Sequence, residues 1–253
     1  MARLHELIHC SRHHTVWHLA LRGIRVVSVR QCSFAIIALF TTCNANADWS
    51  GGIEAGAQLG SDDGPALRFF ANNNSLPLSH FIFLDWIRDS GSGNFRIGYN
   101  PTYRISNSFY SFGRFDLEVD DPDGIDREIN AVVGVGNNLF RRGNTRVKAE
   151  AGLGARQLTF DETEFTGTDD ESDAFLFLSG TMSSSLLALL RFDARIIAKA
   201  GADQTTLDGE LGFSVPIAPR TSLRYVYTVS QFNFDDRENI TTEDTFFKVS
   251  YGF

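Results

Sequence analysis

The stretch Val147-Lys148-Ala149-Glu150-Ala151-Gly152-Leu153-Gly154-Ala155-Arg156 decides the fold. Its odd-numbered residues are all apolar, and its even-numbered residues are charged or glycine. Side chains of a β-strand alternate between the two faces of a sheet, so this pattern predicts a strand with one oily face and one polar face. Ten residues exceed the usual strand of a soluble sheet and match the roughly 9–11 residues of a tilted strand that crosses a bilayer.

The same period of two recurs along the chain, with the clearest examples at 127–135, 192–199, 207–214 and 245–253. Two segments, 81–84 and 175–178, are apolar on both faces, which leaves their register ambiguous. We predict twelve strands, at residues 49–59, 66–72, 78–88, 94–104, 108–119, 126–138, 145–158, 173–182, 186–200, 204–215, 221–234 and 243–253. An even number of strands brings the first and last strand to the same side, where they can pair.

The connections between these strands separate by charge. Nearly every acidic loop residue falls in an odd-numbered connection, whereas the even-numbered turns carry Arg141, Arg142 and Arg220 and almost no acid. A wrong strand count would scramble this separation, so it supports twelve. We therefore predict an all-β fold at residues 48–253, a transmembrane antiparallel up-and-down β-barrel in the bacterial outer membrane. Its termini and short turns would be periplasmic, and its acidic loops external.

Residues 1–47 differ from the rest and are interpreted as a signal peptide. Five arginines accompany a single acid, and the short apolar run at 33–40 precedes Ala45-Asn46-Ala47, a small-residue cleavage pattern. The alternative is a buried helix of a cytosolic domain, which Ala-Asn-Ala followed by Asp-Trp would end poorly. Because residues 1–26 do not look like an ordinary basic leader, we interpret them as a mis-annotated extension, with the true start near Val26–Val29.

Composition excludes several classes of function. Without residues 1–47 the chain has 18 Lys+Arg and 30 Asp+Glu, a formal charge of −12, and no cysteine. This acidity argues against nucleic acid as a partner. The mean hydropathy is −0.13, and the body has no apolar run of roughly 20 residues, which argues against a helical membrane protein. Residues 174–190 could be read as a poor transmembrane helix, but Ser183, Ser184 and Ser185 predict a hairpin turn there instead.

Charged residues lie on the faces that we assign to the barrel interior, because a charge facing lipid costs about 2–4 kcal/mol for Lys or Arg at the bilayer midplane. Two interpretations remain open. Interspersed charges could line a narrow channel, in which rings of charge set selectivity, or paired side chains could fill the lumen, which we favour. The predicted lumen charges are Arg96, Arg104, Arg114, Asp116, Glu118, Glu128, Lys148, Glu150, Arg156, Arg191, Asp193, Arg195, Asp208, Glu210, Arg224 and Lys248, with Glu54, Lys199 and Asp244 beside them.

The acidic loops suggest one class of ligand. The clusters at 120–123, 161–164, 169–171 and 235–236 could hold Ca²⁺ or Mg²⁺ through oxygen ligands, or bridge these ions to lipopolysaccharide. The alternative is that they are simply solvated. We expect outer-membrane lipid and lipopolysaccharide as partners, with aromatic residues near strand ends forming interfacial girdles rather than a soluble core. The terminal Phe253 resembles the signal read by the barrel-assembly machinery.

Catalysis has little support in the sequence. Beyond residue 47 the chain has one histidine, His80, and no serine can be argued to pair with it as nucleophilic catalysis requires. There is no phosphate-binding glycine loop and no Cys or His metal set, so we predict no enzyme activity and no cofactor.

One family resemblance rests on several motifs. They are Tyr110-Ser111-Phe112-Gly113-Arg114-Phe115, Gly124-Ile125-Asp126-Arg127-Glu128, Gly134-Val135-Gly136, Glu150-Ala151-Gly152-Leu153-Gly154-Ala155-Arg156, and the ending from Thr242 to Phe253. This chain resembles the YdiY-like family, catalogued as salt-induced outer-membrane proteins with a domain of unknown function. The first hairpin departs from the family, with Gly60-Ser61-Asp62-Asp63-Gly64 in place of a Gly-Asn-Thr turn. The resemblance implies location and fold but no catalytic residues.

The sequence thus predicts a non-enzymatic outer-membrane barrel with a structural or stress-related role. A narrow channel for small solutes or ions is the alternative, and a lipid-active outer-membrane enzyme is the third possibility.

Overall fold

The computed structural model describes residues 49–60, 63–88, 93–121, 125–160, 171–187, 189–202, 204–234 and 239–253. The chain divides into two units, 1–47 and 48–253, and only the second contains described residues. The expected signal peptide and most of the acidic loop clusters lie outside this part of the chain. Within it, no helix is long and apolar enough to span a membrane.

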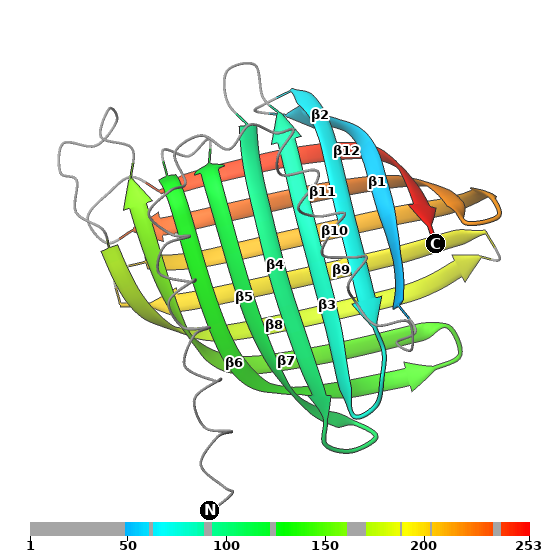
Figure 1. Cartoon of the computed structure of the whole chain (residues 1–253), viewed down its shortest axis with the longest axis horizontal. Helices are drawn as coiled ribbons and strands as arrows, with labels where there is room; N and C mark the ends of the chain where they lie inside the picture. The colour runs from blue at the N-terminus through cyan, green and yellow to red at the C-terminus, as the bar shows by residue number, and fades with distance from the viewer. Residues whose placement is uncertain are drawn as a thin grey trace, which may run out of the picture. The chain divides into compact units, whose positions relative to one another are not determined.

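Twelve antiparallel strands in the described part of the chain close into a barrel, in which each strand pairs with its sequence neighbours and β1 pairs with β12. The predicted twelve-stranded antiparallel barrel is therefore confirmed, and Figure 1 shows β2 to β6 crossing in front of β8 to β12. The strands are β1 (Trp49–Gly60), β2 (Gly64–Asn73), β3 (Leu78–Arg88), β4 (Gly93–Arg104), β5 (Phe109–Asp121), β6 (Ile125–Arg142), β7 (Thr145–Phe160), β8 (Glu171–Leu187), β9 (Leu190–Gly201), β10 (Gln204–Ala218), β11 (Thr221–Phe234) and β12 (Ile240–Gly252).

The predicted hairpin turn at Ser183–Ser185 is wrong. These serines belong to β8, which continues to Leu187 and keeps pairing with β9 through Ser183↔Asp193 and Ser185↔Arg191. Serine favours turns because its hydroxyl can form a hydrogen bond with nearby backbone, and this preference is weak. Here Ser184 shares a 2.8 Å hydrogen bond with the Thr145 hydroxyl of β7, which holds the segment in the sheet.

β6 and β10 also run further than predicted, so that two-residue turns replace longer connections. Gly143 and Asn144 join β6 to β7, and Gly143 has a φ of 55°, a left-handed conformation that glycine adopts without steric cost. These short turns lie at the end of the barrel where β1 begins and β12 ends, which we call the terminus end. The opposite end, which carries the 161–170 connection, we call the loop end.

The outer surface of the barrel is apolar. In the described strands, the outward faces carry mainly apolar, small or uncharged polar residues. Charged exceptions lie near strand ends, at Arg88, Arg127 and Glu243 toward the loop end and at Arg142 beside the β6–β7 turn. Large hydrophobic side chains such as Val133, Leu153 and Phe247 are 53–68% exposed. A protein dissolved in water rarely exposes a continuous apolar surface of this extent. The surface fits contact with lipid chains.

Inward carboxylates fix the register of the two strands that the sequence left ambiguous. Asp85 of β3 pairs in register with Arg68 of β2 on the inner face, and Asp173 of β8 pairs with Arg156 of β7 there. Alternation then directs Phe81, Phe83, Phe175 and Phe177 inward as well. Aromatic side chains consequently occupy part of the lumen, where Phe177 is only 1% exposed.

β6 and β7 approach closely where two inward glycines meet. Gly134 pairs with Gly152, and a Cβ added at Gly134 would lie 2.3 Å from the carbonyl oxygen of Ala151 and 2.8 Å from the Phe112 ring. Neither the backbone of β7 nor the ring, which packs against Phe177 at a centroid distance of 5.8 Å, can yield freely. The glycine thus allows both the bend of the sheet and the packing of aromatic rings over it.

We predict that Gly134→Ala lowers the free energy of unfolding by about 1–3 kcal/mol, the usual cost of forcing an extra carbon into a packed interior. Gly212→Ala is the matched control, because its added carbon would meet nothing closer than 3.6 Å. The measurement is urea-induced unfolding of the barrel refolded in detergent micelles. Equal midpoints for the two variants would contradict the packing argument.

Candidate functional site

The lumen contains a row of ion pairs that joins four strands. The guanidinium of Arg224 on β11 donates to Glu54 of β1 at 2.8 Å and to Glu210 of β10 at 3.3 Å. Glu210 also accepts from Arg195 of β9 at 2.8 Å. The row therefore runs Glu54–Arg224–Glu210–Arg195, with two carboxylates and two guanidinium groups. Charge-assisted hydrogen bonds of this kind are strong because the donors and acceptors are ionised.

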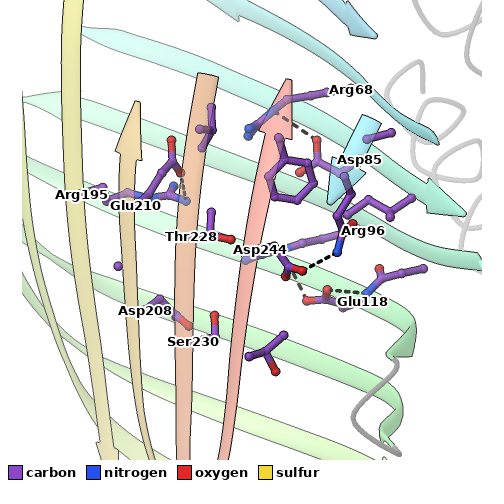
Figure 2. Close-up of a pocket in the computed structure, with 18 of the residues that line it drawn as sticks. Arg68, Asp85, Arg96, Glu118, Arg195, Asp208, Glu210, Thr228, Ser230 and Asp244 are labelled. Atoms are coloured by element: carbon purple, nitrogen blue, oxygen red, sulfur yellow. Dashed lines mark hydrogen bonds and ion pairs between the residues drawn. The ribbon is translucent and has the colours of Figure 1, made fainter. Parts of the chain in front are cut away.

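A second set of pairs lies on the opposite wall. Arg68 of β2 contacts Asp85 of β3 at 3.1 Å, and Arg96 of β4 lies 3.7 Å from both Asp116 and Glu118 of β5. Figure 2 shows the Arg68–Asp85 pair on one side of the lumen and the Arg195–Glu210 pair on the other. We refer to Glu54, Arg68, Asp85, Arg195, Glu210 and Arg224 together as the central charge layer.

Other charged side chains bridge strands that are not neighbours in the sheet. Lys199 of β9 donates to Glu128 of β6 at 3.3 Å. Arg156 of β7, whose side chain is 1% exposed, donates to Asp173 of the neighbouring β8 and, across β8 and β9, to the Thr206 hydroxyl of β10, both at 3.2 Å. Because these contacts pass over intervening strands, they fill the lumen along the wall that β6 to β10 form.

An aromatic cluster occupies the same wall. It consists of Tyr110, Phe112, Val132, Phe175, Phe177 and Ile197, all buried. Arg114 of β5 lies above it, with its guanidinium 4.8 Å from the centre of the Phe177 ring, and pairs with Glu150 of β7. Tyr110 donates its hydroxyl to the same carboxylate at 2.8 Å. The cation–π contact and the shared carboxylate hold this side of the lumen closed.

Among the described residues, the lumen has two cavities of note beside these filled regions. One has a volume of about 270 Å³ and is lined by residues such as Asn94, Asp208, Ser230 and Asp244. The other has a volume of about 690 Å³ and includes Arg146, Ser183 and Ser250, which are close to the terminus end. Four residues line both cavities, and all four belong to the central charge layer: Arg68, Arg195, Glu210 and Arg224. The layer therefore lies where the two spaces meet.

Most of the charges assigned to the lumen by sequence are brought into ion pairs by the structure. The pairs join Arg96 to Asp116 and Glu118, Arg114 to Glu150, Arg156 to Asp173, Arg191 to Asp193, Arg195 to Glu210, Lys199 to Glu128, and Arg224 to Glu54 and Glu210.

Four of the predicted lumen charges are not in an ion pair among the described residues. Lys248 lies 4.4 Å from the centre of the Phe246 ring and Lys148 lies 6.0 Å from that of Tyr110, and neither is in an ion pair within the described residues. Asp208 lines the smaller cavity and likewise has no ion pair in that part of the chain. Arg104 departs from the expectation, because its guanidinium donates to the carbonyl of Ser106 and to Asn107 in the following turn.

Sequence reasoning missed several lumen residues. Arg68 and Asp85 were not among the expected charges, although each is an isolated charge in a largely apolar strand and must turn inward for that reason. Arg146 was missed in the same way. The aromatic cluster had a weaker signal, namely inward glycines such as Gly134 that leave room for rings on neighbouring strands.

His80 lies on the outer surface rather than in the lumen. Its Nδ1 is 2.8 Å from the Tyr99 hydroxyl, and its ring stacks on Tyr99 and Trp49. This arrangement is that of an interfacial aromatic group, and the absence of enzyme activity stays a prediction. The described residues contain no group of three or more His, Cys, Asp or Glu placed to hold a metal ion, and the acidic loop clusters fall almost wholly outside them.

A family model for proteins of unknown function, DUF481, matches residues 88–253, which extend from the end of β3 to the end of the chain. The chain belongs to this family. The match covers most of the charge pairs of the DUF481 protein, whereas Glu54, Arg68 and Asp85 precede it. No curated protein matches the chain closely enough to count as a relative.

Solved structures share the fold of this DUF481 protein. The NanC porin is 8% identical, with a TM-score of 0.55, and the match covers 79% of this chain and 98% of the porin. A bacterial polysaccharide outer-membrane secretin is 6% identical, with a TM-score of 0.50, and the match covers 83% of this chain and 100% of the other. The fold of the DUF481 protein is thus one that outer-membrane porins and channels use.

The central charge layer generates a prediction about stability. Arg224→Gln should lower the free energy of unfolding by about 2–3 kcal/mol, because it leaves Glu54, whose side chain is 4% exposed, as an unpaired buried charge. Arg191→Gln is the control: the Arg191 side chain is 61% exposed, so the loss of its charge should cost at most about 1 kcal/mol. Urea unfolding in micelles measures both, and a smaller effect for Arg224→Gln than for Arg191→Gln would refute the assignment.

Proposed function

We propose that this DUF481 protein is an integral outer-membrane β-barrel that conducts small polar solutes through a narrow lumen, with the central charge layer as its constriction. The observation that carries the proposal is that two cavities with charged and hydroxyl-bearing walls meet at Arg68, Arg195, Glu210 and Arg224. Solutes entering from either end would pass these side chains.

The membrane location is supported by the outer surface. Apolar residues face outward on all twelve strands, and the charged residues Arg88, Arg127, Arg142 and Glu243 on the outward faces lie near strand ends. In hydrocarbon, backbone groups have no water to bind, so a spanning sheet must close on itself as this one does. Short turns at the terminus end fit the periplasmic side, and the longer acidic connections fit the outside. There they would meet lipopolysaccharide and bridging divalent cations.

The charges favour a channel over a barrel that is merely filled. Burying an ion pair is often no better for stability than packing apolar side chains of similar volume. A closed barrel could therefore fill its centre with hydrophobic residues, as the aromatic cluster already does on one wall. The layer instead keeps ionised groups that still have access to the lumen, with Arg195 42% and Arg224 21% exposed. Charge at a constriction of this kind selects solutes.

A structural role is the second candidate, and the filled wall favours it. The Lys199–Glu128 and Arg156–Thr206 contacts span several strands and brace the barrel from inside. Together with the resemblance to salt-induced YdiY-like proteins, this bracing supports an envelope protein that withstands osmotic or ionic stress. The two functions differ in one measurable property, which is whether the lumen conducts.

Planar-bilayer recording of the refolded barrel tests the proposal. We expect small unitary current steps from the wild type. We expect a unitary conductance higher by roughly twofold or more from Arg195→Ser/Glu210→Ser, because this double change would widen the proposed constriction. Arg191→Ser/Asp193→Ser is the matched control, since it removes a pair of the same charges from the wall of the larger cavity, outside the layer. Its conductance should stay close to that of the wild type.

Heat-modifiable gel migration shows whether each protein is folded. If neither the folded wild type nor the folded Arg195→Ser/Glu210→Ser variant gives unitary current steps, the channel is rejected and the structural role remains.

A further inference from the structure

The larger cavity has an excess of positive charge that the protein itself does not neutralise. Six basic and three acidic residues line it. Arg195 and Arg224 are paired within the central charge layer, Arg191 pairs with Asp193, and Arg68 pairs with Asp85 outside the cavity. The two remaining cations are Arg146 and Lys148, which have neither an ion pair nor a hydrogen bond among the described residues.

These two cations lie on one face of one strand. Both belong to β7 and face the cavity, two residues apart. The nearby carboxylate of Glu150 does not balance them, because Arg114 and the Tyr110 hydroxyl already bind it. Lys148 has only a distant contact with the Tyr110 ring, at 6.0 Å. Like Lys248 of the smaller cavity, the two cations have no ion pair among the described residues, in a lumen where most charges are paired.

Hydroxyl groups lie beside both cations. In the β7–β8 register, Arg146 pairs with Ser183 and Lys148 pairs with Thr181, so each cation has a hydroxyl on the adjacent strand. All four residues line the same cavity. A guanidinium, an ammonium and two hydroxyls together form a set of hydrogen-bond donors, which is the chemistry that binds carboxylate and phosphate oxygens.

We propose that the larger cavity is a binding site for small organic oxyanions, held through a carboxylate or phosphate group by Arg146, Lys148, Thr181 and Ser183. The inference deepens the proposed channel function, on which it rests, by naming the solute class. A volume of about 690 Å³ accommodates a molecule the size of a monosaccharide acid. Ser222 and Ser250 on the other side of the cavity can bind hydroxyl groups of such a solute.

Equilibrium titration of the refolded barrel in micelles tests the site with three probes: glucuronate, inorganic phosphate and uncharged glucose. We expect glucuronate, phosphate or both to bind and glucose to bind far more weakly, and the stronger anion identifies the group that is recognised. Arg146→Gln/Lys148→Gln should weaken anion binding by about tenfold or more. Arg146→Lys, which keeps the charge, should retain most of it.

The matched control is Arg88→Gln/Arg127→Gln. It removes the same charge from exposed residues on the outer face near the loop end, outside the cavity, and should leave binding unchanged. Equal weakening in the two double variants, equal binding of glucose and glucuronate, or no binding to the wild type would each overturn the proposal.

The titration needs no current, so the two proposals fail separately. If the barrel binds glucuronate but gives no unitary current steps, the binding-site proposal stands and the channel proposal fails. If the barrel conducts but binds neither anion, the channel proposal stands and the binding-site proposal fails.

Discussion

The structure depends on the pairing of backbone groups in a medium that offers no water. In hydrocarbon each unpaired N–H or C=O costs several kcal/mol, so a sheet can cross only if its first and last strands join. The nine register pairs from Gly52↔Gly252 to Gly60↔Asp244 complete that closure. Once the cylinder is closed, alternation assigns every residue to lipid or to lumen. A charge on any spanning strand then has only the inside available.

Crowding charges into a narrow interior creates the second constraint. Each ionised group loses part of its hydration and must recover it from neighbours. Arg224 does so by serving both Glu54 and Glu210, while Arg114 combines Glu150 with the faces of Phe112 and Phe177. Aromatic rings in the lumen need space, which inward glycines such as Gly134 provide. The ion pairs, the aromatic rings in the lumen and the inward glycines are thus three consequences of the closure of the barrel.

The sequence predicted the features that depend on the alternation of polar and apolar side chains. The twelve strands and the inward face of segments such as 147–156 follow from a period of two, and the separation of acidic loops from basic turns supported the count. Prediction failed in segments where successive residues do not differ in polarity, because alternation then gives no signal. Ser183–Ser185 looked like a turn because serine is polar, yet hydroxyls can face either side of a sheet end. Asp85 and Asp173 could have fixed β3 and β8, since a lone carboxylate in an apolar strand must turn inward. Partners across the lumen, such as Arg156 and Thr206, depend on curvature that no linear pattern encodes.

The lumen and the connections are polarised in the same direction. At the terminus end, Arg146 and Lys148, which have no ion pair among the described residues, lie near Arg141 and Arg142 at the end of β6. The smaller cavity is lined by six basic and six acidic residues, so it lacks the larger cavity's excess of positive charge, and the acidic connections follow at the loop end. Low-dielectric walls focus such a field along the axis instead of letting water disperse it. An anion inside the barrel is therefore drawn toward the terminus end. Because the central charge layer is itself balanced, it adds a steric barrier without reversing that field, so size and charge are selected by different residues.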